Sequence, residues 1–520
     1  MEEKILRLTK RRKKGILRIV FGRMGMILLL ILIQAALLLT IFHWFEEYFK
    51  WFSVGLSVLS VIMLFYLFNC EMDNSAKLTW LMMIMLFPVP GTMFLLFTRM
   101  DIGHRALKDR VGKLISETKD ILPVNESVMN EPEAIESGTD DLCRYVGRSG
   151  CFPLYKRTDV TYFPLGEDKF AALVTELRKA EKFIFLEYFI VDEGKMWGTV
   201  LSILAEKAKE GVDVRMLYDG MCEIALLPHD YPKRLEKLGI KCRAFSPIAP
   251  FISTHYNYRD HRKILVIDGN VAFNGGINLS DEYINIGSRF GHWKDTAVML
   301  RGQAAQSFTL MFLQMWNIPE GKPDWSEALI PAAPEPDAAG YVLPFADSPL
   351  DDEKVGECVY MDILGRARTY VHIMTPYLIL DGELENALKY AAERGVDVKI
   401  ILPGIPDKKA AYALAKTHYK SLVKSGVKLY EYTPGFVHAK VFVSDDSKAV
   451  VGTINLDYRS LYHHFECATY MYGTDCIKDI ERDFAETLER CRAVTPQTIK
   501  REKLSYKLAG AFLKIIAPLM

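Results

Sequence analysis

Two copies of one short pattern carry the residues best suited to chemistry in this chain. Each copy is H-x-K-x4-D, followed after six more residues by a glycine and, three positions later, an asparagine. The matching positions are His261, Lys263, Asp268, Gly275 and Asn278 in the first copy and His438, Lys440, Asp445, Gly452 and Asn455 in the second. One short pattern of this kind can arise by chance, but two extended copies with identical spacing are rarely accidental.

The residue types in this pattern suit a phosphate. On a strand, residues i and i+2 share a face, so each histidine projects beside its lysine. The lysine supplies charge to the non-bridging oxygens, and the asparagine amide adds a donor where negative charge builds up. The glycines would let the backbone approach the anion closely. Asp268 and Asp445 either take part in the site or hold the turn that follows each strand.

Two histidines on one phosphorus indicate a division of labour. A neutral imidazole attacks as the nucleophile and forms a phosphohistidine, while a protonated one donates to the departing alkoxide and later takes a proton from the acceptor hydroxyl. The unperturbed pKa of histidine permits both states near neutral pH. A carboxylate should orient each ring, and Asp295 and Glu466 are the candidates by their position in the two copies.

The elements that position these residues also occur twice. Two β-α-β patterns share the order strand, helix, glycine, strand, and Gly-Val-Asp-Val recurs at 211–214 and 395–398. The predicted ranges are 183–190, 196–209 and 212–218, and then 370–374, 383–394 and 396–402. Duplication explains this best and predicts two α/β halves, at 101–320 and 351–495, that face each other across a pseudo-two-fold axis and form one catalytic unit. Residues 321–350 are the predicted linker.

The N-terminal part has the composition of a membrane anchor. Residues 1–23 are basic, which is typical of a cytoplasmic end. Apolar runs then predict transmembrane helices at about 24–43, 52–69 and 78–98, and together residues 24–100 indicate a multi-pass protein of the cell membrane. Pro88, Pro90 and Gly91 interrupt the third run. If it crosses, the α/β region lies outside; if it turns back, that region lies inside, as the basic residues after position 98 favour.

Three further features narrow the function. Lysine plus arginine equal aspartate plus glutamate at 65 each, so the overall charge gives no reason to expect a nucleic acid. The nine cysteines are scattered without a zinc-like spacing, so we expect mostly buried, reduced thiols and no metal. Residues 496–520 predict an amphipathic helix that either lies on the membrane or packs on the α/β region.

The paired motifs resemble those of the phospholipase D superfamily over roughly residues 130–495. Within it, four segments look like bacterial cardiolipin synthases: 259–263, 275–283, 375–377 and 455–460. Thr453 stands where this family commonly has serine, and His464 stands where asparagine is expected. The resemblance implies that two phosphatidylglycerol molecules yield cardiolipin and glycerol without a metal or cofactor. It also implies that Asp295 and Glu466 orient the histidines and that the histidine of the first motif is the nucleophile.

Other functions use some of the same features. A membrane-bound phospholipase D would use these residues with water as the acceptor. A tethered nuclease would need a basic groove interleaved with aromatic residues, which is not evident in the sequence. A non-enzymatic membrane scaffold would be expected to have lost some of the six motif residues, and none is missing. We therefore expect phosphatidylglycerol and other membrane phospholipids as partners, and no nucleic acid.

Overall fold

The computed structural model describes residues 36, 49–100, 102–149, 152–247, 254–287, 289–323, 325, 329, 337–351 and 353–519. Its first half is a seven-stranded sheet in the order β1-β9-β7-β6-β2-β3-β4. The strands are β1 (Asp159–Phe163), β2 (Phe183–Tyr188), β3 (Asp213–Asp219), β4 (Lys241–Phe245), β6 (Lys263–Ile267), β7 (Val271–Gly275) and β9 (Ala297–Arg301). The helices of this half are α11 (Gly166–Leu177), α12 (Lys195–Lys209), α13 (Cys222–Ala225), α14 (Tyr231–Glu236) and α15 (Ala305–Trp316).

The second half repeats this arrangement strand for strand. Its order is β10-β17-β16-β15-β11-β12-β13, and β18 is added at the end. The strands are β10 (Tyr341–Asp347), β11 (Tyr370–Met374), β12 (Asp397–Pro403), β13 (Lys428–Tyr432), β15 (Val441–Ser444), β16 (Lys448–Gly452), β17 (His464–Tyr472) and β18 (Cys491–Ala493). Its helices are α16 (Val355–Arg366), α17 (Gly382–Glu393), α18 (Lys409–Lys424), α19 (Tyr458–Tyr462) and α20 (Cys476–Leu488). The predicted duplication of an α/β unit is confirmed, and both predicted β-α-β patterns are present with ends shifted by one or two residues.

Two reciprocal strand pairs join the halves. From the first half, β5 (Arg259–Asp260) pairs in parallel with β17, and from the second half, β14 (Gly435–Val437) pairs in parallel with β8 (His292–Lys294). The backbone then continues directly into each motif: the His261 N–H donates to the Phe465 carbonyl at 3.0 Å, and the His438 N–H donates to the Lys294 carbonyl at 2.7 Å. Each motif histidine is therefore fixed to the opposite half.

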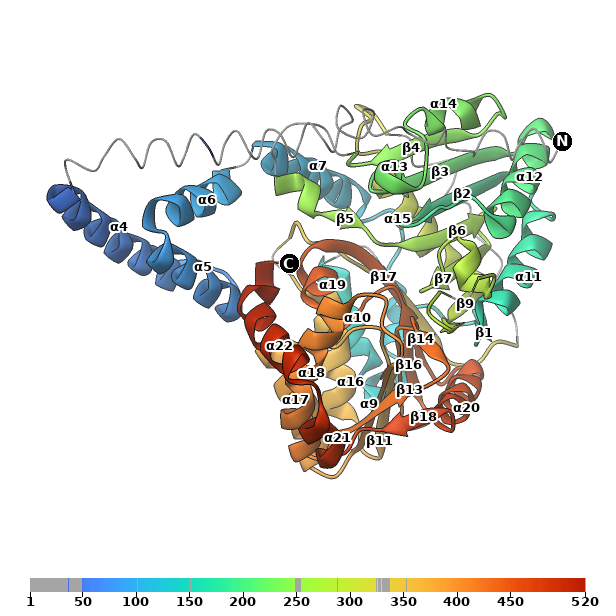
Figure 1. The fold of residues 1–520 in the computed structure, drawn as a ribbon. Coiled ribbons are helices and arrows are strands. Elements are labelled where there is room, and N and C mark those ends of the chain that lie inside the picture. The colour runs from blue at the N-terminus through green and yellow to red at the C-terminus, as the bar shows by residue number, and fades with distance from the viewer. Residues whose placement is uncertain are drawn as a thin grey trace.

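The N-terminal helices form an arm that projects from this body (Figure 1). They are α4 (Phe49–Asn69), α5 (Asn74–Leu86) and α6 (Pro88–Met100), and α7 (Ile102–Thr118) leads back to the body. The predicted run at 78–98 is split at Phe87, because the residue before a proline is kept out of the helical region. Apart from residue 36, the predicted run at 24–43 lies outside the described residues. Within the described residues, no helix reaches the length and hydropathy expected of a membrane span.

The remaining helices pack on the second half. After α8 (Glu126–Met129), α9 (Pro132–Ser137) packs against α10 (Thr139–Ser149), and α10 lies beside α16. At the C-terminus, α21 (Pro496–Arg501), α22 (Leu504–Ile516) and the short η4 (Ala517–Leu519) follow β18. One face of helix α22 packs along α18 (Figure 1), and large apolar side chains on its other face stay exposed, so packing on the body leaves contact with the membrane open. Every cysteine in the described part of the chain is a free thiol.

Candidate active site

The two motif histidines lie where the halves meet. His261 connects β5 to β6, and His438 connects β14 to β15. Strands β6 and β15 are buried along their whole length, as their apolar sequences require, and they hold the histidines and lysines in place. His261 and His438 are only 6% and 7% exposed, while Lys263 and Lys440 are buried almost completely. The two histidine–lysine pairs are therefore not part of the solvent-exposed surface. Titratable groups buried in this way indicate a reactive site.

Each histidine is held by a carboxylate from the opposite half. His261 Nδ1 lies 2.9 and 3.0 Å from the two carboxylate oxygens of Glu466, which is in β17. His438 Nδ1 lies 2.7 Å from Oδ2 of Asp295, which follows β8. With Nδ1–H donated to the carboxylate, the Nε2 lone pair of each ring is free to react, which is the tautomer that a nucleophile or a base requires. The structure thus brings both predicted orienting carboxylates to the histidines and crosses them between the halves.

The carboxylates are themselves fixed. The Thr453 hydroxyl donates to Glu466, so the threonine that stands in place of serine keeps the hydrogen bond of a hydroxyl. Asp295 Oδ1 accepts from the Thr296 N–H at 2.8 Å. Gly276 lies against Asp295, and a Cβ at that position would come within 2.1 Å of the Asp295 carboxylate. Glycine at 276 is therefore needed so that Asp295 can reach His438.

Three buried lysines lie beside the two carboxylates of the site. Lys263, Lys440 and Lys169 are each at most 1% exposed. Burial is the main cause that lowers their pKa values, to about 8 for Lys263 and about 7 for both Lys440 and Lys169. Asp295 opposes this shift for Lys169 and Lys440, and Glu466 opposes it for Lys263. Since a buried ammonium is costly without a counter-charge, this group of lysines is suited to binding an anion.

Both imidazoles are held in the neutral form. Burial and the neighbouring Lys263 lower the pKa of His261 well below its usual value. Burial and Lys440 lower the pKa of His438 to about 4, although Asp295 acts in the opposite direction. The sequence-based hypothesis of opposite protonation states therefore needs the negative charge of a phosphodiester, which favours an imidazolium beside it. His438, with a carboxylate that already raises its pKa, is the histidine more easily protonated.

The asparagines and glycines of the motifs have different surroundings in the fold. Asn278 accepts from the Ile190 N–H at 3.0 Å and donates to the Tyr283 hydroxyl at 2.7 Å, so its amide is largely engaged in the fold. Asn455 is buried, and its Oδ1 has no hydrogen-bond partner among the described residues. Gly275 and Gly452 end β7 and β16, and a Cβ there would meet the adjacent strand at 2.5 and 2.2 Å. These glycines make room for the neighbouring strands, and their predicted approach to a phosphate stays a prediction.

Asp268 and Asp445 lie at the far ends of strands β6 and β15. Each lies seven positions along the chain from its histidine, which corresponds to roughly 20 Å in extended backbone. Each carboxylate instead accepts three backbone N–H groups at 2.8–2.9 Å, from the residues at the start of the neighbouring strand. The donors are Glu181, Lys182 and Phe183 for Asp268, and Arg368, Thr369 and Tyr370 for Asp445. This geometry favours the alternative in which the two aspartates hold the turns over a catalytic role.

Replacing Asp445 by alanine should therefore destabilise the fold and leave the chemistry intact. Asp446→Ala is the matched control, because both residues have a positive φ, 52° and 53°, so the backbone cost of alanine is the same. Loss of three charge-assisted hydrogen bonds should make Asp445→Ala less stable than Asp446→Ala by about 2–4 kcal/mol in urea unfolding. Turnover per folded molecule should stay within about twofold of the parent. A large loss of turnover at unchanged stability would instead place Asp445 in the reaction.

Two residues without a repeated partner also line the site. The His464 ring lies 5.1 Å from the His261 ring, and its Nδ1 is 3.5 Å from Glu466. Arg459 Nε donates to His464 Nε2 at 3.1 Å. Lys169 comes from α11 and donates to the Ile277 carbonyl at 3.1 Å. In the sequence, His464 stands out only as a departure from the family pattern. Its position two residues before Glu466, on the same face of a strand, was the signal that could have placed it at the site.

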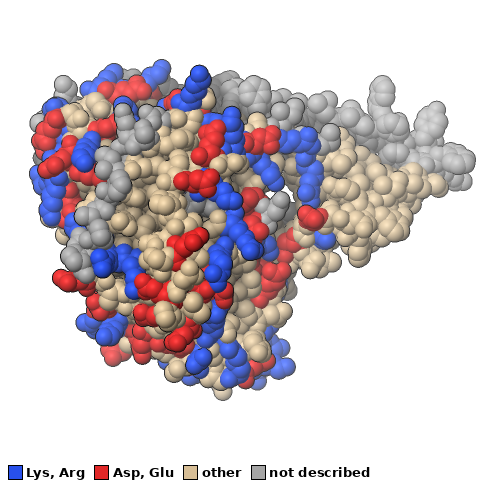
Figure 2. Space-filling view, turned by 180° about the vertical axis from the view of Figure 1, so that it is seen from behind, with Lys and Arg blue, Asp and Glu red and all other residues tan. Residues whose placement is uncertain are grey.

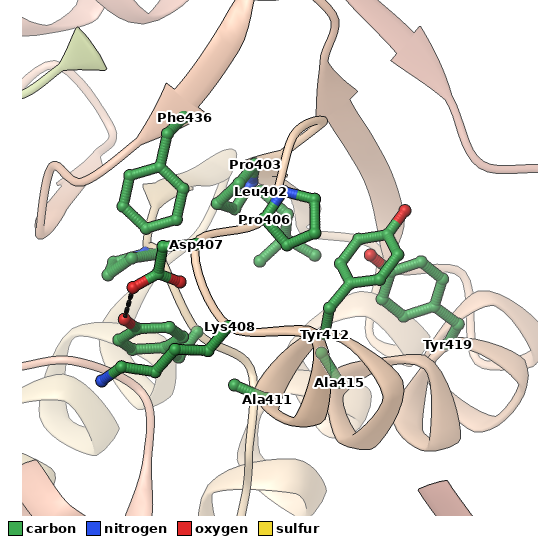
Figure 3. A pocket seen from close by; sticks show the side chains of 12 residues that line it. Leu402, Pro403, Pro406, Asp407, Lys408, Ala411, Tyr412, Ala415, Tyr419 and Phe436 are labelled. Carbon is green, nitrogen blue, oxygen red and sulfur yellow. Dashed lines mark hydrogen bonds between the residues drawn. The ribbon is translucent and has the colours of Figure 1, made fainter. Parts of the chain in front are cut away.

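Aromatic rings enclose both histidines. Phe189 lies 4.9 Å from the His261 ring, and the rings of Tyr283 and Trp293 each lie 5.4 Å from that of His438. Phe436, 5.9 Å from His438, is also one wall of a narrow pocket (Figure 3). Prolines, alanines and tyrosines line most of the rest of it, and the Tyr377 hydroxyl donates to Asp407 at 2.6 Å. The surroundings of the site suit a partly apolar substrate.

One group of side chains near the site has the composition of a metal centre. His261, His464 and Glu466 can each offer one ligand atom, and these atoms lie within 4.8 Å of one another. Arg459 already donates to His464, and the charge of Lys263 acts on both His261 and Glu466. Two positive groups beside these atoms oppose a cation, so the charge distribution fits an anionic ligand better.

Two duplicated α/β halves that place paired histidines and lysines at one buried junction are the features of an enzyme of the phospholipase D type that acts on phosphodiesters. The comparisons with known proteins agree. The family described as "Cardiolipin synthase, PLD-like domain" matches residues 173–316 and 360–488. A cardiolipin synthase of Halalkalibacterium halodurans is 32% identical over 507 residues, which is 96% of this chain and 100% of that protein. The chain belongs to the family of bacterial cardiolipin synthases of the phospholipase D superfamily.

Two other similarities bear on the family and the fold. An uncharacterised protein of Streptococcus mutans is 60% identical over 455 residues, which is 88% of this chain and 99% of that protein. The crystal structure of phosphatidylserine synthase of Haemophilus influenzae aligns with a TM-score of 0.53 at 14% identity, covering 70% of this chain and 97% of that one. At that level of identity the solved structure supports the fold alone.

Proposed function

We propose that this protein makes cardiolipin by transferring a phosphatidyl group from one phosphatidylglycerol molecule to the free hydroxyl of another, with release of glycerol. The observation that carries the proposal is the crossed pair His261–Glu466 and His438–Asp295, surrounded by buried lysines. Two histidines held in this way supply a nucleophile and a general acid–base catalyst on the two sides of one anionic phosphorus.

The first half-reaction breaks the bond between phosphorus and the glycerol head group. His261 Nε2 attacks the phosphorus of the donor lipid and forms a phosphorus–nitrogen bond, while the phosphorus–oxygen bond to glycerol breaks. His438, protonated in the presence of the anionic lipid, gives its proton to the departing alkoxide, and glycerol leaves. Lys263 and Lys440 stabilise the charge on the non-bridging oxygens as it redistributes.

The second half-reaction reverses these roles. His438, now neutral, takes the proton from the head-group hydroxyl of the second phosphatidylglycerol. That oxygen attacks the phosphorus, and the phosphorus–nitrogen bond to His261 breaks. The product is cardiolipin, and both imidazoles return to their starting states. The sequence of steps needs one nucleophile and one acid–base, which matches two histidines with different neighbours.

The arm supports a position in the cell membrane. Large apolar side chains on α4, α5 and α6 are exposed and form a nearly uncharged surface, whereas both signs of charge cover the body (Figure 2). These side chains include Val58, Ile62, Phe65, Phe68, Leu78, Met85, Met93 and Phe94. An apolar surface of this extent is costly in water and is typical of a membrane-binding region. We propose that the arm is inserted in the bilayer as part of a multi-pass anchor and holds the site near its lipid substrates.

The reaction is tested with the full-length protein reconstituted into vesicles of phosphatidylglycerol labelled in its terminal glycerol. We expect cardiolipin and labelled glycerol in equal amounts, because one glycerol leaves for each cardiolipin formed. Vesicles of phosphatidylcholine alone are the control and should give neither product. Release of labelled glycerol with phosphatidic acid and no cardiolipin would show that water is the acceptor, and the protein would then be a hydrolase.

A further inference from the structure

Helix α22 carries an exposed apolar stripe on the face that points away from the body. Leu504, Leu508, Phe512 and Ile515 recur at helical spacing and are 69%, 64%, 66% and 41% exposed. We call these four residues the α22 stripe. Single exposed apolar residues are common on protein surfaces, but four on one face of a short helix mark a binding surface.

The opposite face of α22 is firmly packed, so the helix cannot turn to bury its stripe. Gly510 lies against α18, where a Cβ would come within 2.4 Å of the Ala413 carbonyl oxygen. The Tyr506 ring contacts the Tyr412 ring at 5.8 Å, and Ala517 just beyond the helix is buried beside Leu414. The exposure of the stripe is therefore a fixed property of the folded chain.

The stripe is continuous with the apolar arm. The Thr79 hydroxyl of α5 donates to the Ile515 carbonyl at the end of α22 at 2.7 Å, and α5 also contacts η4. Figure 1 shows α22 at the base of the arm, on the same side of the body. A bilayer that surrounds the arm would therefore meet the α22 stripe as well.

A basic pocket opens on one side of the stripe. The pocket has a volume of about 510 Å³ and is bounded by α18, α21, α22, β13 and β18. Its basic lining residues are Lys416, Lys420, Arg492, Arg501, Lys503 and Lys507. Its two acidic residues are Glu431, which accepts from Lys416 and Arg492, and Glu502, which pairs with Lys416 at 2.7 Å. The lining therefore has an excess of positive charge.

We propose that the α22 stripe and this pocket form a second lipid-binding surface, which takes the head-group phosphate of an anionic phospholipid while the stripe lies among acyl chains. Charge and shape support this occupant, because a basic concavity beside an apolar helix face matches a lipid with a negative head group. The inference rests on the membrane position of the arm proposed above. Its consequence is that anionic lipids gather close to an enzyme that consumes one of them.

The position of α22 is tested with a fluorescent amino acid, dansylalanine, placed one position at a time in the full-length protein in nanodiscs. Position 512 reports on the stripe, position 65 on the arm, and position 175, exposed on α11, on the far side of the body. Phosphatidylcholine with a nitroxide on its acyl chain should quench the first two and spare the third. Quenching at 65 but not at 512 would overturn the inference and leave the arm in the membrane. No quenching at 65 would overturn the membrane position itself.

Selectivity for the anionic head group is tested by quenching at position 512 with nitroxide-labelled phosphatidylglycerol against the same label on phosphatidylcholine. The parent protein should prefer phosphatidylglycerol, and Lys503→Gln with Lys507→Gln should lower the preference by about fivefold for each lysine. The charge-matched control is Lys233→Gln with Lys237→Gln, at exposed positions near α14, and should leave the preference unchanged. An equal preference in the parent and the Lys503/Lys507 variant would overturn a head-group role for the pocket.

Discussion

Alanine in place of His261 is expected to abolish both cardiolipin formation and the covalent phosphatidyl-enzyme, each by more than about 10³-fold. Alanine in place of His438 is expected to abolish cardiolipin formation but to spare the covalent intermediate when the donor is a 4-nitrophenyl phosphatidyl ester. Nitrophenolate departs without a proton, so attack by His261 no longer needs an acid. The intermediate is measured as acid-labile lipid label on the denatured protein.

The neighbours of the two histidines give the physical reason for assigning the roles in this way. The positive groups around His261, above all Lys263, add to burial in lowering its pKa, which keeps Nε2 unprotonated and nucleophilic. Burial and Lys440 lower the pKa of His438, but Asp295, which contacts the ring directly, raises it. Once an anionic lipid adds its charge, His438 is therefore the ring that protonates first.

A matched control exists outside the site. His372 is also buried, and its Nδ1 lies 2.9 Å from a carboxylate oxygen of Glu481. It lies in β11 and belongs to neither copy of the H-x-K-x4-D motif. His372→Ala should retain both labelling and transfer per folded molecule. Labelling that survives in the His261 variant and disappears in the His438 variant would exchange the two roles. Labelling in both single variants would rule out a single nucleophilic histidine.

Local patterns in the sequence were enough to predict the duplicated halves and to single out the two histidine–lysine pairs that meet at the junction. Side chains alternate between the two faces of a strand, and this alternation depends only on neighbouring residues. The spacing from His261 to Asn278, and its repetition from His438 to Asn455, could therefore be interpreted without the rest of the fold. Burial of β6 and β15 and the break before Pro88 follow from equally local rules. These features do not depend on how the two halves dock.

Contacts between the halves could not be predicted in the same way. Which carboxylate serves which histidine depends on the pairing of β5 with β17 and of β8 with β14, and these strands lie far apart in the sequence. His464 comes close to His261 only through the same pairing. For Asp268, the sequence left two roles open, because the three N–H donors that the carboxylate accepts from lie more than eighty residues away.

The second large loss of activity is expected for variants of Glu466 and Asp295, because each of these carboxylates contacts the histidine of the opposite half. Glu466→Gln should lose the covalent intermediate with the 4-nitrophenyl ester, because the amide can hold His261 in the wrong tautomer, with the proton on Nε2. Asp295→Asn should keep that intermediate and lose transfer to phosphatidylglycerol, because it acts on His438. By analogy with a hydrolase triad, each loss should be about 10²–10⁴-fold.

Each of these variants should therefore resemble the histidine variant of the opposite half, which is what distinguishes crossed pairs from pairs within one half. If Glu466 acts only through His261, the double variant with His261→Ala should be no worse than His261→Ala alone. Glu481→Gln, at the carboxylate that holds His372, is the matched control and should leave turnover unchanged. A Glu466 variant that labels normally but fails in transfer would mean that this carboxylate serves the acid–base step, and the orientation of His261 would then need another source.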